Sequence, residues 1–340
     1  MGRRQTDSEL SRLAVLIIFV LGCISFFMFY FCFSVGYKPS TSHASLDSTL
    51  SFSGGGQEEE EEEEEERCCR GIEHLELWGD AVKWGANFKV NSSKECCMAC
   101  KDTCEAEDRP CSCDSWVFCG DKQACGSRFG ECWLKKQKDA LEPNPRDARD
   151  QVMWTSGLIF GKGEGIVRLE TEYGTLHVKL LPDSAPLSVA YMLELLASRH
   201  CVGCQFHRAE SRGTHWDTEG NHIENASGGY GPPFALIQGS LETHSITFKE
   251  IPLEVCSTIR RGSVAWVGSG PEFFISLANH NEWKKVYTVF GIVLPEDMEI
   301  AERIARLPTK QEVWSNVNVS VLEKPIPLRF RRISTSQATL

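Results

Sequence analysis

The chain has 340 residues, of which 41% are hydrophobic and 24% are charged, and its formal net charge is −11 at pH 7. This length predicts about two domains with additional segments rather than one compact unit. Most of the negative charge comes from nine consecutive glutamates, Glu58 to Glu66, so it does not describe the folded parts. The sequence has no P-loop, zincin signature or Gly-x-Ser-x-Gly motif, which argues against those sites, and we expect no nucleic-acid partner.

A hydrophobic segment follows a short N-terminal tail of residues 1–12. Leu13 to Tyr37 contains 25 residues without a charge, and about 20 apolar residues in a helix can cross a bilayer. Arg3, Arg4 and Arg12 precede it and only Lys38 follows closely, which favours a cytosolic N-terminus. We therefore predict a signal-anchor and a single-pass type II protein of the secretory pathway, in the Golgi or plasma membrane; a cleaved signal peptide is the alternative.

Residues 38–67 have the composition of a stem. Ser40 to Gln57 is rich in Ser, Thr and Gly, and the glutamate run follows it. Such a segment cannot bury a core, so we expect a disordered acidic stem. A site for calcium or a basic partner is the alternative for the glutamates.

Cysteines are concentrated in one stretch: 11 of the 16 lie between Cys68 and Cys132. This density predicts disulfides in an oxidising compartment, with zinc binding as the alternative. Because eleven is odd, at least one cysteine is free, paired with the following domain, or bonded to another chain. Three Asn-x-Ser sequons, at Asn91, Asn225 and Asn318, predict glycosylation.

Residues 68–154 resemble a PAN or apple-type module, a small disulfide-rich α+β domain. The resemblance rests on three segments: Cys96-Cys97-x2-Cys100-x3-Cys104, Trp116-Val117-Phe118 and Cys132-Trp133-Leu134-Lys135. It implies that this module binds a protein or glycan ligand. A linker, Glu142 to Arg149, with two prolines among charged residues, follows the cysteines.

The pattern changes again after Gly163. Ile166 to Leu180 alternates apolar and polar residues around a Tyr-Gly-Thr turn, which predicts two strands and a tight turn. Ser188 to Ser198 then has the apolar periodicity of a helix. We place this second domain at residues 163–325 and a tail at 326–340.

Four segments of this domain resemble the cyclophilin family of peptidyl-prolyl isomerases. They are Phe206-His207-Arg208, Ile237-Gln238-Gly239, the run from Gly268 to Ile275, and Val289-Phe290-Gly291. The resemblance extends from about Gly165 to Val321 and implies a mainly-β closed barrel with flanking helices. It also implies isomerisation of X-Pro bonds in proline-containing polypeptides, without a cofactor or a metal.

The resemblance assigns roles to individual residues. Arg208 would donate a hydrogen bond to the proline nitrogen when amide conjugation breaks, and Gln238 would hold the substrate backbone. Leu236, Phe274 and Trp283 would line the proline pocket, whose apolar walls suit a ring that has no amide hydrogen. The remaining candidate substrate-binding residues are His207, Val267, Gly268, Glu272 and Tyr287.

The sequence also departs from the family pattern. Between Arg208 and Gln238 lie 29 residues where the family has a short turn, and this insertion could form a lid or block the groove. Ala235 stands where the family has a pocket phenylalanine, which predicts a reduced pocket wall. Glu272 replaces a neutral amide, and we hypothesise that it forms an ion pair with Arg208.

A second cluster, His200-Cys201-x2-Cys204-x2-His207, allows a local disulfide, free thiols or a metal site. Taken together, the sequence predicts a multi-domain chain with one transmembrane helix, the apple-like module and the cyclophilin-like barrel. The expected function is that of a membrane-anchored luminal isomerase that assists the folding of secretory-pathway proteins. The alternative is a catalytically weak or inactive binding or adaptor protein that recognises protein or glycan partners.

Overall fold

The computed structural model describes residues 68–104, 111–147, 151–198, 203–224, 229–241 and 248–333, all within one compact unit, Gly56–Leu340. We correct the predicted localisation as a type II membrane protein, because no helix in these ranges is long and apolar enough to cross a membrane. The segment that suggested it, Leu13 to Tyr37, and the stem of residues 38–67 lie outside the described residues.

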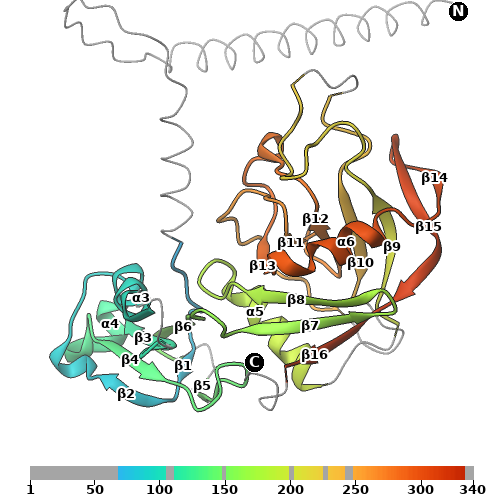
Figure 1. Cartoon of the computed structure of the whole chain (residues 1–340). Helices are drawn as coiled ribbons and strands as arrows, with labels where there is room; N and C mark the ends of the chain where they lie inside the picture. The colour runs from blue at the N-terminus through green and yellow to red at the C-terminus, as the bar shows by residue number, and fades with distance from the viewer. Residues whose placement is uncertain are drawn as a thin grey trace, which may run out of the picture. The chain divides into compact units, whose positions relative to one another are not determined.

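The cysteine-rich part is built on a small antiparallel sheet in the order β2-β4-β3-β6, and β1 pairs with β5 in a separate two-stranded sheet (Figure 1). Helix α3 packs on β3 and β4 through its buried cysteines. The elements are β1 (Glu76–Leu77), β2 (Asp80–Lys83), η1 (Gly85–Asn87), α3 (Ser93–Lys101), η2 (Asp102–Cys104), β3 (Ser115–Cys119), α4 (Lys122–Cys125), η3 (Gly126–Arg128), β4 (Cys132–Lys136), β5 (Pro145–Asp147) and β6 (Trp154–Leu158).

Disulfides provide much of the core of this part. Five bonds lie within it: Cys69–Cys97, Cys96–Cys132, Cys100–Cys113, Cys104–Cys111 and Cys119–Cys125. The eleventh cysteine, Cys68, pairs with Cys256 of the second domain, which confirms one of the three predicted outcomes for the odd cysteine. Closely spaced disulfides of this kind are typical of an oxidising compartment.

The second part is a mainly-β domain whose ten strands follow the order β14-β15-β9-β10-β12-β11-β13-β8-β7-β16. Only Leu328 separates β15 from β16, and the run they form pairs with β9 at one end and β7 at the other. This shared run closes the sheet into a barrel (Figure 1). The elements are β7 (Ile166–Thr171), β8 (Gly174–Leu180), α5 (Pro186–Ala197), β9 (Gln205–Glu210), β10 (Leu236–Ser240), β11 (Ser263–Trp266), β12 (Glu272–Ser276), η4 (Asn281–Trp283), β13 (Val289–Val293), η5 (Pro295–Asp297), α6 (Met298–Ile304), β14 (Thr309–Trp314), β15 (Val317–Pro327) and β16 (Arg329–Arg332).

The first elements of the barrel domain confirm the prediction made from the sequence pattern. β7 and β8 form the predicted antiparallel hairpin, and α5 is the predicted helix, beginning two residues early at Pro186. A proline fits this first position because its missing amide hydrogen would have no partner within the helix. Glu254 accepts hydrogen bonds from the backbone N–H groups of Leu187 and Ser188, both at 2.8 Å, and so caps this end of α5.

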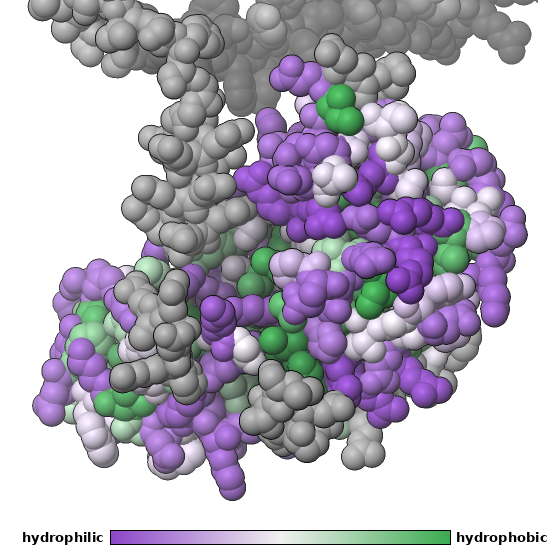
Figure 2. Space-filling model, in the orientation of Figure 1, coloured by the Kyte–Doolittle hydropathy of each residue, from purple (hydrophilic) through white to green (hydrophobic). Residues whose placement is uncertain are grey.

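Alternation along β10 and β12 separates the barrel interior from an outer face. Ile237 and Phe273 point inward and pack with Phe206 in the main core, where each is at most 1% exposed. Leu236 and Phe274 belong to a separate apolar cluster, since neighbouring side chains in a strand face opposite sides. The molecular face shown in Figure 2 is largely hydrophilic, with small hydrophobic patches.

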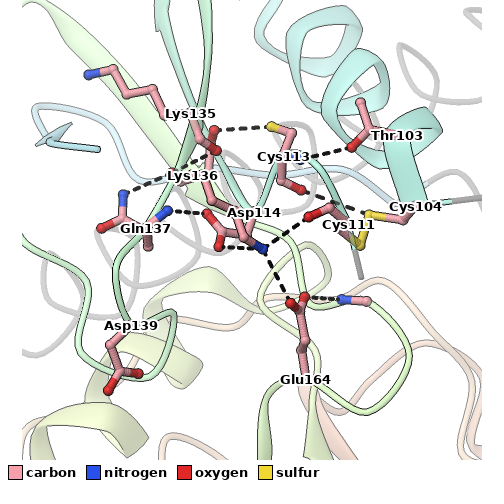
Figure 3. A network of polar contacts seen from close by, with 12 residues as sticks. Thr103, Cys104, Cys111, Cys113, Asp114, Lys135, Lys136, Gln137, Asp139 and Glu164 are labelled. Atoms are coloured by element: carbon pink, nitrogen blue, oxygen red, sulfur yellow. Dashed lines mark hydrogen bonds and ion pairs between the residues drawn. A yellow bond between two sulfur atoms is a disulfide. The ribbon is translucent and has the colours of Figure 1, made fainter. Parts of the chain in front are cut away.

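An ionic network around the buried Asp114 connects β4 with the segment that precedes β7 (Figure 3). Lys136 Nζ lies 3.0 Å from Asp114 Oδ2 and 3.2 Å from Glu164 Oε1, and the Gln137 N–H donates to Asp114 Oδ1 at 2.6 Å. Burial raises the pKa of Asp114, against the lowering effects of Gln137 and Lys136. Burial alone would lower the pKa of Lys136, but the two carboxylates outweigh it and raise that pKa.

Candidate functional site

A β-bulge in β9 creates the site. Gln238 on β10 is paired with Arg208, whereas the next residue, Gly239, is paired with Phe206, so His207 is the additional residue on β9. A bulge of this kind redirects side chains from the regular alternation of a strand. It brings His207 and Arg208 to the same outer face, where Arg208 contacts Gln238 of the neighbouring strand β10 and His207 contacts Glu272 of the next strand, β12.

Arg208 is held on several sides. Its Nε lies 2.9 Å from Glu210 Oε1, and its Nη1 donates to Gln238 Oε1 at 3.0 Å. The rings of Phe234 and Trp314 lie 5.6 and 5.7 Å from its Cζ, within the range of cation–π attraction. The Arg208 side chain is 13% exposed, and within the described residues its Nη2 has no hydrogen-bond acceptor.

Glu210 is a carboxylate that the sequence motifs did not identify. Its side chain is 0% exposed, and it also accepts hydrogen bonds from the backbone N–H groups of Phe234 at 2.6 Å and Ser320 at 3.3 Å. It therefore connects the guanidinium of Arg208 to the end of the insertion and to β15. The signal available in the sequence was an acidic residue two positions after Arg208, which in a strand lies on the same face as Arg208.

Glu272 does not pair with Arg208 as we hypothesised, because Glu210 takes that position. The Glu272 carboxylate instead lies 3.1 Å from His207 Nε2 and accepts a hydrogen bond from Gln238 Nε2 at 3.1 Å. Burial raises the pKa of Glu272, but the hydrogen bonds with His207 and Gln238 outweigh burial and hold that pKa below its ordinary value. Glu272 thereby orients the Gln238 amide so that its oxygen faces Arg208.

An aromatic cluster adjoins these polar groups. Phe274 has edge-to-face contacts with Trp283 and Tyr287, at 5.8 and 5.2 Å between ring centroids, and Leu236 belongs to the same cluster. Burial raises the pKa of Tyr287, while the nearby charge of Arg208 acts in the opposite direction. Four predicted pocket residues are thus brought together beside Arg208.

The pocket wall that we expected to be reduced is supplied by another residue. Ala235 is fully buried, but the preceding residue, Phe234, lies 6.4 Å from Trp283 between ring centroids and 5.6 Å from the Arg208 guanidinium carbon. Sequence alignment by position missed Phe234, because a residue at the end of a 29-residue insertion has no counterpart in the family motif. Ile259, also in the cluster, was missed for the lack of a motif around it.

Val267 and Gly268 occupy the turn between β11 and β12. The Val267 N–H donates to the Glu272 carbonyl oxygen at 2.8 Å, which places this turn next to the start of β12. Val267 is 38% exposed, and a Cβ added to Gly268, at φ +62°, would meet nothing within 4 Å. The outer side of this turn is therefore open at both residues.

The insertion packs against the aromatic cluster through stacked rings. Trp216, which is 3% exposed, contacts the edge of His280 with 5.2 Å between centroids. His280 in turn stacks on Trp283 at 3.7 Å and 3°. The insertion therefore supports the pocket from behind at Trp283 and closes one side of it at Phe234.

The remaining sequence candidates are the His/Cys cluster around Cys204 and the three glycosylation sequons. Cys204 is disulfide-bonded, which argues against the metal site, and Cys201 lies outside the described residues. Asn91 and Asn318 are exposed, whereas Asn225 lies outside the described residues. Exposure of the first two is compatible with glycosylation.

Residues 166–324 match the sequence model of a family described as cyclophilin type peptidyl-prolyl cis-trans isomerase/CLD. Among curated proteins, the chain is similar to peptidyl-prolyl cis-trans isomerase-like 3 from Gallus gallus, at 25% identity over 45% of this chain and 89% of that protein. The Dictyostelium discoideum protein of the same name is 29% identical over 42% of this chain and 83% of its own length.

Two solved structures are also similar. One is a cyclophilin type peptidyl-prolyl cis-trans isomerase from Cryptosporidium parvum with the dipeptide Ala-Pro, at 18% identity and a TM-score of 0.37 over 50% of this chain and 99% of that one. The other is the cyclophilin AquaCyp293 from Hirschia baltica, at 14% identity and a TM-score of 0.31 over 51% and 74%. The family match does not include the cysteine-rich part, whose likeness to an apple-type module stays a prediction. By the family match and the curated relatives, residues 166–324 form a divergent domain of the cyclophilin-type peptidyl-prolyl cis-trans isomerases.

Proposed function

We propose that this protein catalyses the cis-trans isomerisation of X-Pro bonds in polypeptides of an oxidising compartment, with Arg208 as the catalytic residue. The observation that carries this proposal is the position of the guanidinium. Arg208 is fixed by Glu210 and Gln238 and lies beside the apolar cluster that contains Phe234, Phe274 and Trp283. The disulfides of the cysteine-rich part support the choice of compartment.

The chemistry follows from the electronic structure of the X-Pro amide. Conjugation of the nitrogen with the carbonyl group produces a barrier of about 18 to 20 kcal/mol. In the twisted transition state the nitrogen regains its lone pair and can accept a hydrogen bond, which it cannot do in either planar state. A donor aimed at that nitrogen stabilises the transition state selectively and therefore accelerates the reaction.

The residues divide these tasks. The proline ring enters the apolar cluster, where Phe274 and Trp283 contact its methylene groups. Gln238 holds the substrate backbone, and Arg208 donates through Nη2, since Nε and Nη1 already contact Glu210 and Gln238. Binding the ring and the backbone separately lets the bond between them rotate.

The test is isomerisation of short X-Pro peptides by the oxidised full-length chain, followed by NMR exchange spectroscopy. We expect Arg208→Ala to lower kcat/KM roughly 100- to 1,000-fold, the usual effect of removing one preorganised donor. Arg208→Lys should retain the charge but lose most of the activity, because an ammonium group cannot reproduce the fork geometry. Arg331→Ala, a change at an exposed arginine of β16, is the matched control.

A second candidate function is binding of proline-containing segments without efficient turnover. The observation that favours it is the buried Glu210 carboxylate, which partly neutralises the charge of the guanidinium. Under this alternative, the wild-type chain binds an X-Pro peptide and Trp283→Ala weakens that binding, but neither the wild type nor Arg208→Ala accelerates exchange. Acceleration by the wild type that is lost in Arg208→Ala decides for the enzyme.

A further inference from the structure

The cysteine-rich sheet has an open edge at β2. This strand is last in the order β2-β4-β3-β6, and among the described residues no strand pairs with its outer side (Figure 1). All four of its residues, Asp80 to Lys83, are exposed. An open strand edge presents main-chain N–H and C=O groups that can pair with another extended chain.

Two large indoles flank this strand. Trp78, just before β2, is 51% exposed, and Trp84, just after it, is 62% exposed; Val82 between them is 45% exposed. Exposed tryptophans at one place are unusual in a folded domain and are enriched at the centres of interfaces. Here they stand at both ends of the same open edge.

A groove of about 600 Å³ runs from this edge over the face of the sheet. Trp133 of β4 and the largely buried Trp154 of β6 contribute to its lining, with Ala81 on the β2 side. Besides its indoles, the groove has three carboxylates and two basic residues: Glu76, Asp80, Glu131, Arg128 and Lys135.

The indoles are held in place before any ligand binds. Trp84 and Trp133 lie 5.3 Å apart between centroids, and Trp133 Nε1 donates to Glu131 Oε2 at 3.2 Å. Gly85 permits this contact, because a Cβ there would lie 2.2 Å from Trp133 Cδ1. Such preorganisation lowers the entropy that binding must overcome.

The charges favour one kind of ligand. Lys135 is buried, donates to the Leu77 carbonyl oxygen at 2.7 Å, and lies 5.7 Å from the ring of Trp78. Its charge is therefore directed into the domain, which leaves the carboxylates of Asp80 and Glu131 in excess over Arg128 in the groove. Indole faces together with carboxylates attract apolar and cationic side chains.

From these observations we propose that β2 and the adjoining tryptophan groove bind an extended polypeptide segment with alternating apolar and basic side chains. The segment pairs its main chain with β2 as an added strand, and its alternate side chains enter the groove. A sugar could stack on the indoles but would leave the main-chain edge of β2 unused, so the combination of edge and groove favours a polypeptide. This site lies on a different sheet from Arg208 and does not depend on isomerase activity.

The probe is an acetylated, amidated octapeptide of alternating leucine and lysine, which contains no proline and cannot report on isomerisation. We expect it to bind the oxidised full-length chain and to slow backbone amide exchange in residues 80–83, measured by hydrogen exchange. Trp84→Ala should weaken the Kd at least about tenfold, the scale of an interface hot spot. Leu253→Ala, a change at a residue 58% exposed outside the groove, should leave the Kd unchanged.

Two further measurements make the result decisive. The same octapeptide N-methylated at alternate residues keeps its side chains but loses main-chain hydrogen bonds, and it should bind the wild type at least about tenfold more weakly. This arm needs no variant and is independent of folding defects. Equal affinity of both peptides, or no slowing of exchange at 80–83, overturns the proposal; so does Trp84-dependent binding of chitotetraose without binding of the octapeptide.

Discussion

The Glu210 carboxylate lies 2.9 Å from Arg208 Nε, and its side chain is fully buried. The same carboxylate accepts a hydrogen bond from the Phe234 N–H. One carboxylate therefore positions both the Arg208 guanidinium and Phe234, near the end of the insertion. This relationship gives the insertion a direct role in the arrangement of the site.

Replacing Glu210 tests that role. Glu210→Gln should lower kcat/KM roughly 10- to 100-fold, because a hydrogen bond to a charged partner contributes about 1.5 to 3 kcal/mol. We expect the loss mainly in kcat, since Arg208 would be displaced while the apolar cluster remains. The matched control is Glu219→Gln, at an exposed carboxylate of the insertion. Unchanged or increased kcat/KM in Glu210→Gln would contradict the positioning role.

Glu272 gives a prediction for pH dependence. Its pKa in the folded state lies below the ordinary value of 4.5 because hydrogen bonds with His207 and Gln238 outweigh burial. The ionised group therefore stabilises the folded state above about pH 4.5, and this contribution is lost as the pH falls through the lowered pKa. Glu272→Gln should show a shallower loss of stability in acid.

The measurement for Glu272 is the free energy of unfolding in urea from pH 7 to pH 3. The difference between wild type and Glu272→Gln should shrink as the pH falls, whereas Glu296→Gln, at an exposed glutamate, should follow the wild type throughout. A difference that stays constant over this range would show that Glu272 is not stabilised in its ionised form. At pH 7 we also expect Glu272→Gln to have lower isomerase activity than the wild type, because Glu272 no longer orients the Gln238 amide.

Phe234 should determine how tightly the proline ring is held. Phe234→Ala removes contacts with Trp283 and with Arg208, and one aromatic contact contributes about 0.5 to 1.5 kcal/mol. We expect KM for an X-Pro peptide to rise roughly 3- to 10-fold, with a smaller change in kcat. Steady-state kinetics with Phe129→Ala, at a partly exposed phenylalanine of the cysteine-rich part, provides the comparison. An unchanged KM would remove Phe234 from the pocket.

The ionic network at Asp114 should affect stability rather than catalysis. Asp114→Ala removes a side chain that is only 1% exposed and leaves the Gln137 N–H without its acceptor, while Lys136 keeps Glu164 and the Cys111 carbonyl oxygen. Leaving a buried N–H without an acceptor costs about 1 to 3 kcal/mol. Urea denaturation should show that loss, while Asp80→Ala, at an exposed aspartate, should remain within about 0.5 kcal/mol of wild type. Equal stability of the two variants would contradict the importance of the network.

The sequence by itself determined features that depend on neighbouring residues. The alternation from Ile166 to Leu180 identified the β7–β8 hairpin, and the motifs singled out Arg208, Gln238 and Phe274, which lie on β9, β10 and β12. The cysteine spacing predicted a disulfide framework, because the density of cysteines along the chain can be read without knowing the fold. The charge-free run of the N-terminal region, in contrast, led to a localisation that we have corrected.

Only the tertiary structure decided which residues complete the site. The bulge that turns His207 and Arg208 to one face depends on pairing between β9 and β10, across the insertion. Three further contacts depend on how segments far apart in the sequence pack together. They are the contact of Phe234 with Arg208, the pairing of Arg208 with Glu210 rather than Glu272, and the Cys68–Cys256 bond. Local patterns fix the period and face of a strand, but such long-range contacts are set by packing and chain closure, which no short window of sequence contains.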